Sequence, residues 1–348
     1  TAITLLPNPT FADGETGTEP PKAADGYYLL DSAEDLYWFS GFVNGRSNIN
    51  DKVNARLEAD INLNPGISFA YNHENGKITV SKNNGKSFHL GSGLKGTSLG
   101  ALDDGETAFS LNPWTPIGTD SASFKGTFDG GYHVVSGLYI ASGSTVGLFG
   151  CVNGGTVKNL VVRGEVTGSS NVAGVVGNLK AGTVENCGNE ANVTGGSSVG
   201  GVVAYVDGTC TVRGCYNAGD VLANAGNFTG YYMGGVTGQH WGTATVENCY
   251  NVGTVSGSAT VGGVTAGFKR ATITMTNCYN AGTVTDTTGS ANNIGAVLGA
   301  AGTPTITNCY YLTGTGTNIQ SGVTEVTAID PAALGDAFAA GDTHPVLT

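Results

Sequence analysis

Cysteine is the residue in this chain with the greatest chemical potential, because a thiolate can bind a metal, attack a substrate or form a disulfide. Five of the seven cysteines recur in one local context, in VENCGNEANV (184–193), VRGCYNAGDV (212–221), VENCYNVGTV (246–255), MTNCYNAGTV (275–284) and ITNCYYLTGT (306–315). The intervals between them are 28, 34, 29 and 31 residues. Metal sites use short spacings such as C-x2-C, which do not occur here. The spacing therefore argues against a metal centre.

The position of these cysteines in the repeat also accepts leucine. Upstream, VKNLVV and VSGLYI place Leu160 and Leu138 in the same position of the motif. A position that holds either Leu or Cys is typical of a small apolar site in a core. We therefore expect a structural column of buried, reduced side chains, made of Leu138, Leu160, Cys187, Cys215, Cys249, Cys278 and Cys309. Cys151 and Cys210 lie outside this column, and the sequence leaves open whether either forms a disulfide.

A second repeated pattern predicts the elements that carry this column. VGLFG (146–150), AGVVG (173–177), GGVVA (200–204), GGVTG (234–238), GGVTA (262–266) and GAVLG (295–299) each precede a segment that alternates apolar and polar residues up to the N-C motif. A third short strand fits GEV, ANV, GDV, GTV and GTV just after each motif. Short strands in units of roughly 22–34 residues are the signature of a parallel β-helix solenoid. The sequence predicts an all-β, single-stranded parallel β-helix of about seven coils, whose neighbouring strands lie about 4.8 Å apart.

The repeats also predict two columns of asparagine. Asn159, Asn186, Asn248, Asn277 and Asn308 precede the column position, and Asn189, Asn217, Asn251 and Asn280 follow it. Stacked amides satisfy buried turn backbone.

The open ends of a solenoid must be capped, and two segments of this chain have the sequence signals of capping helices. At 31–45 Ser32 is the expected N-cap, Asp35 completes a capping box, and the packing face holds Leu36, Trp38, Phe39 and Phe42. At 330–341 Asp330 is the expected N-cap, Pro331 lies in the first turn and Gly341 lies past the end. We expect a lead-in at 1–26, the solenoid at 27–328 and a capping helix with a tail at 329–348.

Composition excludes several classes of function. The formal net charge is −12, with 15 Lys and Arg residues. This argues against nucleic-acid partners, whose phosphates require basic side chains, and against an anionic bilayer. No apolar run is long enough to span a membrane. We expect a monomer without a cofactor or metal.

Several stretches resemble the GLUG-repeat proteins, bacterial secreted or surface chains that include a non-catalytic region of IgA1-specific metalloproteases. The stretches are WTPIGT (114–119), FKGTFDGGYHVVSGLYI (124–140), VGLFG and the N-C-Y-N copies, with LLDSAEDLYWFSGFVNG and ARLEADINLN before them. The resemblance implies a right-handed β-helix and an extracellular or cell-surface setting. It does not imply proteolysis, because HENGK has Lys77 where a HExxH zinc site needs its second His.

The chain departs from the family pattern by an insertion at 65–113. KITVSKNNGKSFHL (77–90) within it predicts a hairpin that turns at 83–85. We interpret the insertion as a flap over the first coils. Its densest acidic cluster, Asp103, Asp104 and Glu106, is a candidate for calcium or for catalysis, although neighbouring loop residues seldom converge on one ion.

The tyrosines next to the column predict a binding surface. In N-C-Y the Cys faces inward, so strand alternation directs Tyr216, Tyr250, Tyr279 and Tyr310 outward. Their rings, with Trp241, form a candidate strip on which sugar rings stack. The alternative is that the tyrosines stack only on one another and stabilise the solenoid.

We therefore expect a non-catalytic extracellular module that adheres to glycans or glycoproteins. One alternative is a β-helix polysaccharide lyase or glycoside hydrolase, which would need carboxylates gathered around one groove. Another is a spacer that belongs to an IgA1-protease-like surface peptidase. Ice binding would require T-x-T on every coil, and only 243–245, 272–274 and 303–307 approach that pattern.

Overall fold

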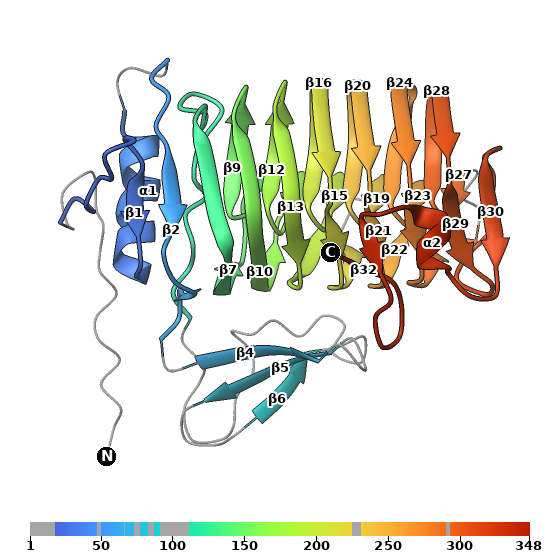
Figure 1. The fold of residues 1–348 in the computed structure, drawn as a ribbon, viewed down its shortest axis with the longest axis horizontal. Coiled ribbons are helices and arrows are strands. Elements are labelled where there is room, and N and C mark those ends of the chain that lie inside the picture. Colours follow the sequence, from blue (N-terminus) through green and yellow to red (C-terminus); the bar gives the residue numbers. More distant parts are fainter. Residues whose placement is uncertain are drawn as a thin grey trace.

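The computed structural model describes residues 18–46, 50–65, 67–72, 77–82, 87–90, 111–224, 231–289 and 293–348, with only the backbone described from 67 to 90. These residues form a solenoid of stacked parallel strands (Figure 1). The predicted all-β fold with parallel sheets is confirmed.

A long strand followed by short ones makes up each repeat. The long strands and the shorter segments aligned with them are β7 (Thr127–Ile140), β9 (Phe149–Asn153), β10 (Thr156–Thr167), β12 (Val176–Lys180), β13 (Thr183–Asn189), β16 (Val203–Arg213), β20 (Thr237–Glu247), β24 (Thr265–Thr276) and β28 (Leu298–Thr307). The strands that follow a turn are β14 (Asn192–Gly195), β17 (Tyr216–Asn217), β18 (Val221–Ala223), β21 (Tyr250–Asn251), β22 (Val255–Gly257), β25 (Tyr279–Asn280), β26 (Val284–Asp286), β29 (Cys309–Leu312) and β30 (Val323–Val326). The predicted third strand therefore exists.

A separate six-stranded sheet closes the other side of the coils. It contains β8 (Thr145–Val146), β11 (Asn171–Ala173), β15 (Ser198–Gly200), β19 (Tyr232–Gly234), β23 (Thr260–Gly262) and β27 (Asn293–Gly295). The second repeated pattern predicts its short Gly-rich strands a few residues too late: each observed strand ends at the first residue of the pattern, and the residues after it form a bend and then the start of the next strand. The central residues of the observed strands, from Val146 to Ile294, are in register and point into the core.

The register of the long strands builds the core from equivalent positions. One buried column runs through Phe128, Val157, Val184, Val212, Val246 and Met275. Because every rung contributes an apolar side chain at the same position, each coil buries its apolar face against its neighbours.

The cysteine column is confirmed, with one correction. Leu160 is in register with Cys187, and all seven cysteines are free and buried. Leu138 does not belong to the column: it is buried but pairs with Gly164, and His133 is opposite Leu160. The extra residues of the turn at Gly130, Gly131 and Tyr132 shift the register of β7.

The two asparagine columns are also observed. Asn189, Asn217, Asn251 and Asn280 are fully buried, and each of the first three donates from Nδ2 to the Oδ1 of the next at 2.7–2.8 Å. Each Nδ2 also donates to the carbonyl two residues ahead, at 2.8 Å. In the other column the asparagines have φ of 51–56°, a left-handed conformation that Asn tolerates better than most residues.

The N-terminal end carries a helix next to β1 (Tyr28–Leu30), β2 (Ala55–Leu57) and β3 (Ile61–Asn62) (Figure 1). Helix α1 (Ala33–Asn44) begins after Ser32, whose side chain accepts from the Asp35 amide. Leu36 and Phe39 are fully buried, and Phe39 contacts Phe128 of the first long strand with ring centroids 6.1 Å apart. Trp38 and Phe42 stack beside them.

The C-terminal helix differs from the expected one. Helix α2 is only Pro331–Leu334, because the chain leaves the helical path at Gly335 (φ 90°). Its Leu334 packs against tyrosines on the flank of the solenoid. At the end of the solenoid, β30 pairs with β29, and the carbonyls of Thr315 and Thr317 accept hydrogen bonds from Val284 and Ala296.

Within the predicted insertion, β4 (Ile67–Asn72), β5 (Lys77–Lys82) and β6 (Ser87–Leu90) form an antiparallel sheet. The predicted pairing of the hairpin is confirmed, and its turn lies outside the described residues. So do Asp103, Asp104 and Glu106.

The buried amides make a stability prediction. Replacing Asn251 by Ala removes the side-chain donor to the Gly253 carbonyl and one hydrogen bond each from the Asn217 Nδ2 and the Asn280 Oδ1. Because a buried polar group without a hydrogen bond costs about 1–3 kcal/mol, we expect the free energy of unfolding in urea to fall by about 3 kcal/mol. The control is Asn153→Ala at an exposed position, expected to change it by less than about 0.5 kcal/mol. Equal effects of the two variants would contradict the role of the column.

A second prediction concerns pH. His240 is in register with Val206 in a core position, donates or accepts at Thr237 Oγ1 (2.8 Å), and is fully buried. Burial lowers its pKa from 6.5 to about 3. Below pH 6.5 the unfolded chain therefore binds a proton that the folded chain excludes, and stability is lost as the pH falls toward 3.

The difference between wild type and His240→Gln isolates this effect. Between pH 6.5 and pH 3 we expect the free energy of unfolding of the wild type to fall by up to about 1.4 kcal/mol more per pH unit than that of the variant. Above pH 6.5 the two curves of unfolding free energy against pH should run parallel. Parallel curves from pH 7 to pH 4 would show that His240 is protonated in the folded protein.

The thiols give a third prediction. Burial raises the pKa of Cys187 and Cys249 well above the ordinary value and that of Cys151 to about 11. Because all seven thiols are buried, a disulfide reagent cannot reach them in the folded protein, so none should react quickly at pH 8, and all seven should react in denaturant. Rapid native modification of even one thiol would rule out a closed core there.

Candidate functional site

Four tyrosines that follow the cysteine column are in register on successive coils and are here called the tyrosine ladder: Tyr216, Tyr250, Tyr279 and Tyr310. The Tyr216 and Tyr250 rings lie 5.3 Å apart with an interplanar angle of 10°. The Tyr250 and Tyr279 rings lie 5.0 Å apart at 1°. The predicted alignment on successive coils is therefore present, and the rings stabilise one another.

The tyrosine ladder is not the exposed strip that strand alternation predicts. The C-terminal segment (residues 330–348) crosses it, so that Tyr250 is 5% exposed and Tyr279 is fully buried. Phe338 meets the edges of both rings, and the Tyr279 hydroxyl donates to the Pro345 carbonyl. Only Tyr216 and Tyr310 remain half-buried. A sugar cannot stack on Tyr250 or Tyr279 in this arrangement.

The ladder ends at Tyr216 because the next rung holds Gly188. A side chain at Gly188 would overlap the Tyr216 ring, with a Cβ only 2.3 Å from it. The Tyr216 hydroxyl donates to Glu190 at 2.7 Å, and Glu190, 1% exposed, is paired with Arg163 at 2.5 Å. Burial, and then the Glu190 carboxylate, raises the pKa of Tyr216. Tyr216 is therefore a neutral hydrogen-bond donor near pH 7.

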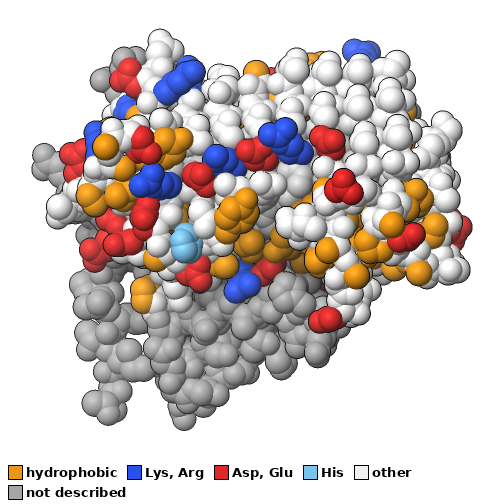
Figure 2. Space-filling model, viewed as in Figure 1, with side chains coloured by type: hydrophobic (Ala, Val, Ile, Leu, Met, Phe, Trp, Pro, Cys, Tyr) orange, Lys and Arg blue, Asp and Glu red, His pale blue; other side chains and the backbone are white. Residues whose placement is uncertain are grey.

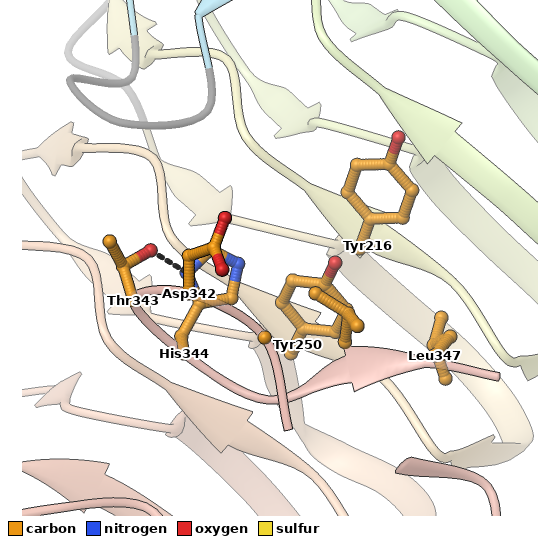
Figure 3. Close-up of a pocket in the computed structure, with 8 residues that line it drawn as sticks. Tyr216, Tyr250, Asp342, Thr343, His344 and Leu347 are labelled. Carbon is orange, nitrogen blue, oxygen red and sulfur yellow. Dashed lines mark hydrogen bonds between the residues drawn. The ribbon is translucent and has the colours of Figure 1, made fainter. Parts of the chain in front are cut away.

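A pocket of about 480 Å³ lies where the C-terminal segment leaves the ladder. On one side are Tyr216 and Tyr250; on the other are Gly341, Asp342, Thr343, His344, Val346 and Leu347 (Figure 3). The Thr343 hydroxyl and the His344 Nδ1 lie 2.9 Å apart, and the His344 ring lies 5.6 Å from the Tyr250 ring. Short antiparallel strands β31 (Phe338–Ala339) and β32 (Val346–Leu347) hold this part of the chain in shape.

Trp241 occupies a different, open surface. It is 48% exposed, and its ring stacks on Phe268 with centroids 5.0 Å apart at 25°. Tyr232 meets Phe268 edge-on at 5.8 Å. We call Trp241, Phe268 and Tyr232 the aromatic platform. Of the tyrosines and tryptophan proposed as stacking residues, Trp241 is the most exposed.

Polar side chains border the aromatic platform. Asp207 is in register with Trp241 on the neighbouring strand, and Tyr205 is in register with Gln239. Gln239 accepts a hydrogen bond from Ser198 at 2.8 Å, which fixes its orientation. The platform therefore combines an apolar face with hydrogen-bonding groups at its edge.

Charged groups on the outer face are largely paired with one another. Lys158 pairs with Asp129 at 3.3 Å, and Arg213 pairs with Glu185 at 2.5 Å. Asp129 also accepts from the Gly131 amide, as expected of a residue that holds a turn. No cluster of three or more His, Cys, Asp or Glu side chains that could hold a metal occurs among the described residues.

Beyond these ion pairs, the outer face over β20, β24 and β28 is mostly uncharged and polar (Figure 2). One column of threonines runs through seven strands: Thr127, Thr156, Thr183, Thr211, Thr245, Thr274 and Thr305. A second column contains only Thr209, Thr243, Thr272 and Thr303. The requirement for T-x-T on every coil is therefore not met.

The sequence missed three components of these surfaces. The partner of Trp241 is Phe268, one coil away, and the register of β20 with β24 shifts between Thr237 and Thr243. Glu190 stands where the repeat usually has Ala or Val, and this departure was a usable signal. The contact of residues 341–347 with the ladder has no signal in the repeat. In the described ranges no helix is both long and apolar enough to cross a bilayer.

Comparison with known proteins finds a match to one repeat motif and a solved structure of similar fold. A family model described as the GLUG motif matches residues 229–256, which contain β19, β20 and β21. No curated protein sequence matches this chain at a significant level. A solved structure described as a "putative immunoglobulin A1 protease from Bacteroides ovatus" superposes with a TM-score of 0.59 and 18% identity, over 95% of each chain. At this identity the similarity concerns the fold. The chain therefore contains a GLUG motif at residues 229–256 and shares its fold with that immunoglobulin A1 protease-like protein.

Proposed function

We propose that this chain is a non-catalytic module of a secreted or cell-surface bacterial protein and that it binds glycans or glycoproteins. The observation that carries the proposal is the aromatic platform. An indole ring that is 48% exposed and held flat by a second ring offers a rigid apolar face. Sugar rings present C–H groups on one face and hydroxyl groups at the edge, which suits such a surface.

The polar border supports the same ligand class. Asp207 and Gln239 lie beside Trp241, and both carry oxygens that accept hydrogen bonds from hydroxyl groups. We include immunoglobulin A among the candidate glycoproteins because the protein of similar fold is named after it.

Ion pairing of the acidic side chains supports the proposal that the module is non-catalytic. Glu190, Glu185 and Asp129 each have a Lys or Arg partner within 3.3 Å. A nearby cation stabilises the ionised carboxylate and opposes the raised pKa that a general acid requires.

We further propose that the scaffold is a right-handed parallel β-helix of about seven coils, capped at its N-terminal end by α1, with residues 65–113 as a side flap. On this view the solenoid is a rigid monomer that holds the aromatic platform on one face, as repeat proteins commonly present extended binding surfaces.

The test is retention of the labelled protein on an array of plant, microbial and mucin glycans and of immunoglobulin A, with released reducing sugar measured in the same wells. We expect retention without release. Trp241→Ala should weaken retention by roughly tenfold or more, since removal of a central aromatic side chain typically costs more than 1 kcal/mol.

The matched control is Tyr132→Asn. Tyr132 is 75% exposed on β7, and Asn tolerates its positive φ of 63°. Equal retention by wild type and Trp241→Ala would reject the platform. Release of sugar would support the lyase or hydrolase alternative, and absence of retention in every well would favour the spacer.

A further inference from the structure

The pocket beside the tyrosine ladder is a second candidate site, and it exists for a structural reason. The C-terminal segment lies across Tyr279 and Tyr250 and then diverges from the ladder before it reaches Tyr216. A hollow with two aromatic walls therefore remains open at the end of the ladder (Figure 3).

The two sides of this pocket have complementary chemistry. Tyr216, Tyr250, Val346 and Leu347 supply aromatic and aliphatic surface. Asp342 and Thr343 are exposed and carry a carboxylate and a hydroxyl, next to the His344 ring. Among the described residues, the Asp342 carboxylate has no hydrogen bond or ion pair. It can therefore accept hydrogen bonds from a ligand.

The aromatic side is rigid. Tyr216 is fixed by its stack on Tyr250 and by its hydrogen bond to the buried Glu190. Glu190 is held in turn by Arg163. A wall fixed in this way loses little conformational entropy when a ligand binds.

We propose that this pocket binds one neutral sugar ring, with the Asp342 carboxylate accepting hydrogen bonds from adjacent sugar hydroxyl groups and the ring lying against Tyr216 and Leu347. The volume of about 480 Å³ is within the range of about 300–1,000 Å³ that is usual for small-ligand sites. A carboxylate is a strong acceptor for paired hydroxyl donors.

Charge selects against acidic sugars. Among the described residues, the pocket is lined by Asp342 and by no Lys or Arg, and the nearby Arg163 is already paired with Glu190. A uronic or sialic acid would bring its carboxylate into this negative site and be repelled. The proposal relies on the proposed function for the class of ligand only, since it concerns a different surface.

The test uses the full chain and titrates methyl glucoside, methyl galactoside, methyl mannoside, N-acetylglucosamine and glucuronate by saturation-transfer NMR. We expect saturable binding of at least one neutral sugar and at least tenfold weaker binding of glucuronate. Asp342→Ala and Thr343→Val, both at exposed positions, should each weaken the binding of that sugar at least fivefold. Asp336→Ala, which removes an exposed carboxylate elsewhere in the C-terminal segment, should leave it unchanged.

Trp241→Ala separates this proposal from the proposed function. If the pocket is a site, this variant loses retention on the glycan array but keeps sugar binding in solution. Loss of both would place the only sugar site at the aromatic platform and overturn the proposal. So would the absence of neutral-sugar binding to the wild type, binding that persists in Asp342→Ala and Thr343→Val, or glucuronate binding as tight as that of a neutral sugar.

Discussion

The register of the stacked parallel strands is the constraint on which the rest of this structure depends. Once Val157 lies beside Val184 and Val212, every equivalent position of the repeat lies in a straight column. The fully buried asparagines fix this register, because each amide must meet the next one within hydrogen-bond distance. A slip of one residue would leave these amides unpaired in the core, at a cost that apolar packing does not recover.

The same register produces surfaces as well as a core. It aligns the tyrosines so that their rings stack, and it aligns seven threonines along the outer face. Departures from the repeat are where these surfaces change. Gly188 ends the ladder and leaves room for the Tyr216 ring, and Trp241 stands out on a strand whose neighbour carries Asp207 at the same position. The irregular rungs of a regular solenoid are therefore the natural places for individual function.

The C-terminal segment determines which aromatic surface is available. By burying Tyr250 and Tyr279 it converts an aromatic strip into part of a small apolar cluster with Leu334 and Phe338. Burial of these rings stabilises the segment against the solenoid, since aromatic side chains contribute large apolar areas. The platform at Trp241 is left as an open aromatic surface, and the pocket marks the edge of the covered one.

The sequence by itself determined the structural features that recur from coil to coil. The cysteine column, both asparagine columns, the short third strands and the helix that begins after Ser32 could all be predicted, because identical residues at equal spacing must occupy equivalent places in a solenoid. The same reasoning misplaced Leu138, which lies 22 residues before Leu160, whereas the residue in register with Leu160 is His133, 27 residues before it. Only the tertiary structure decided which tyrosines are covered, that Phe268 supports Trp241, and that Asp342 and His344 lie beside Tyr250. Those contacts join an aperiodic segment or a shifted strand to the repeat, and they are set by packing between residues far apart in the chain rather than by any local pattern.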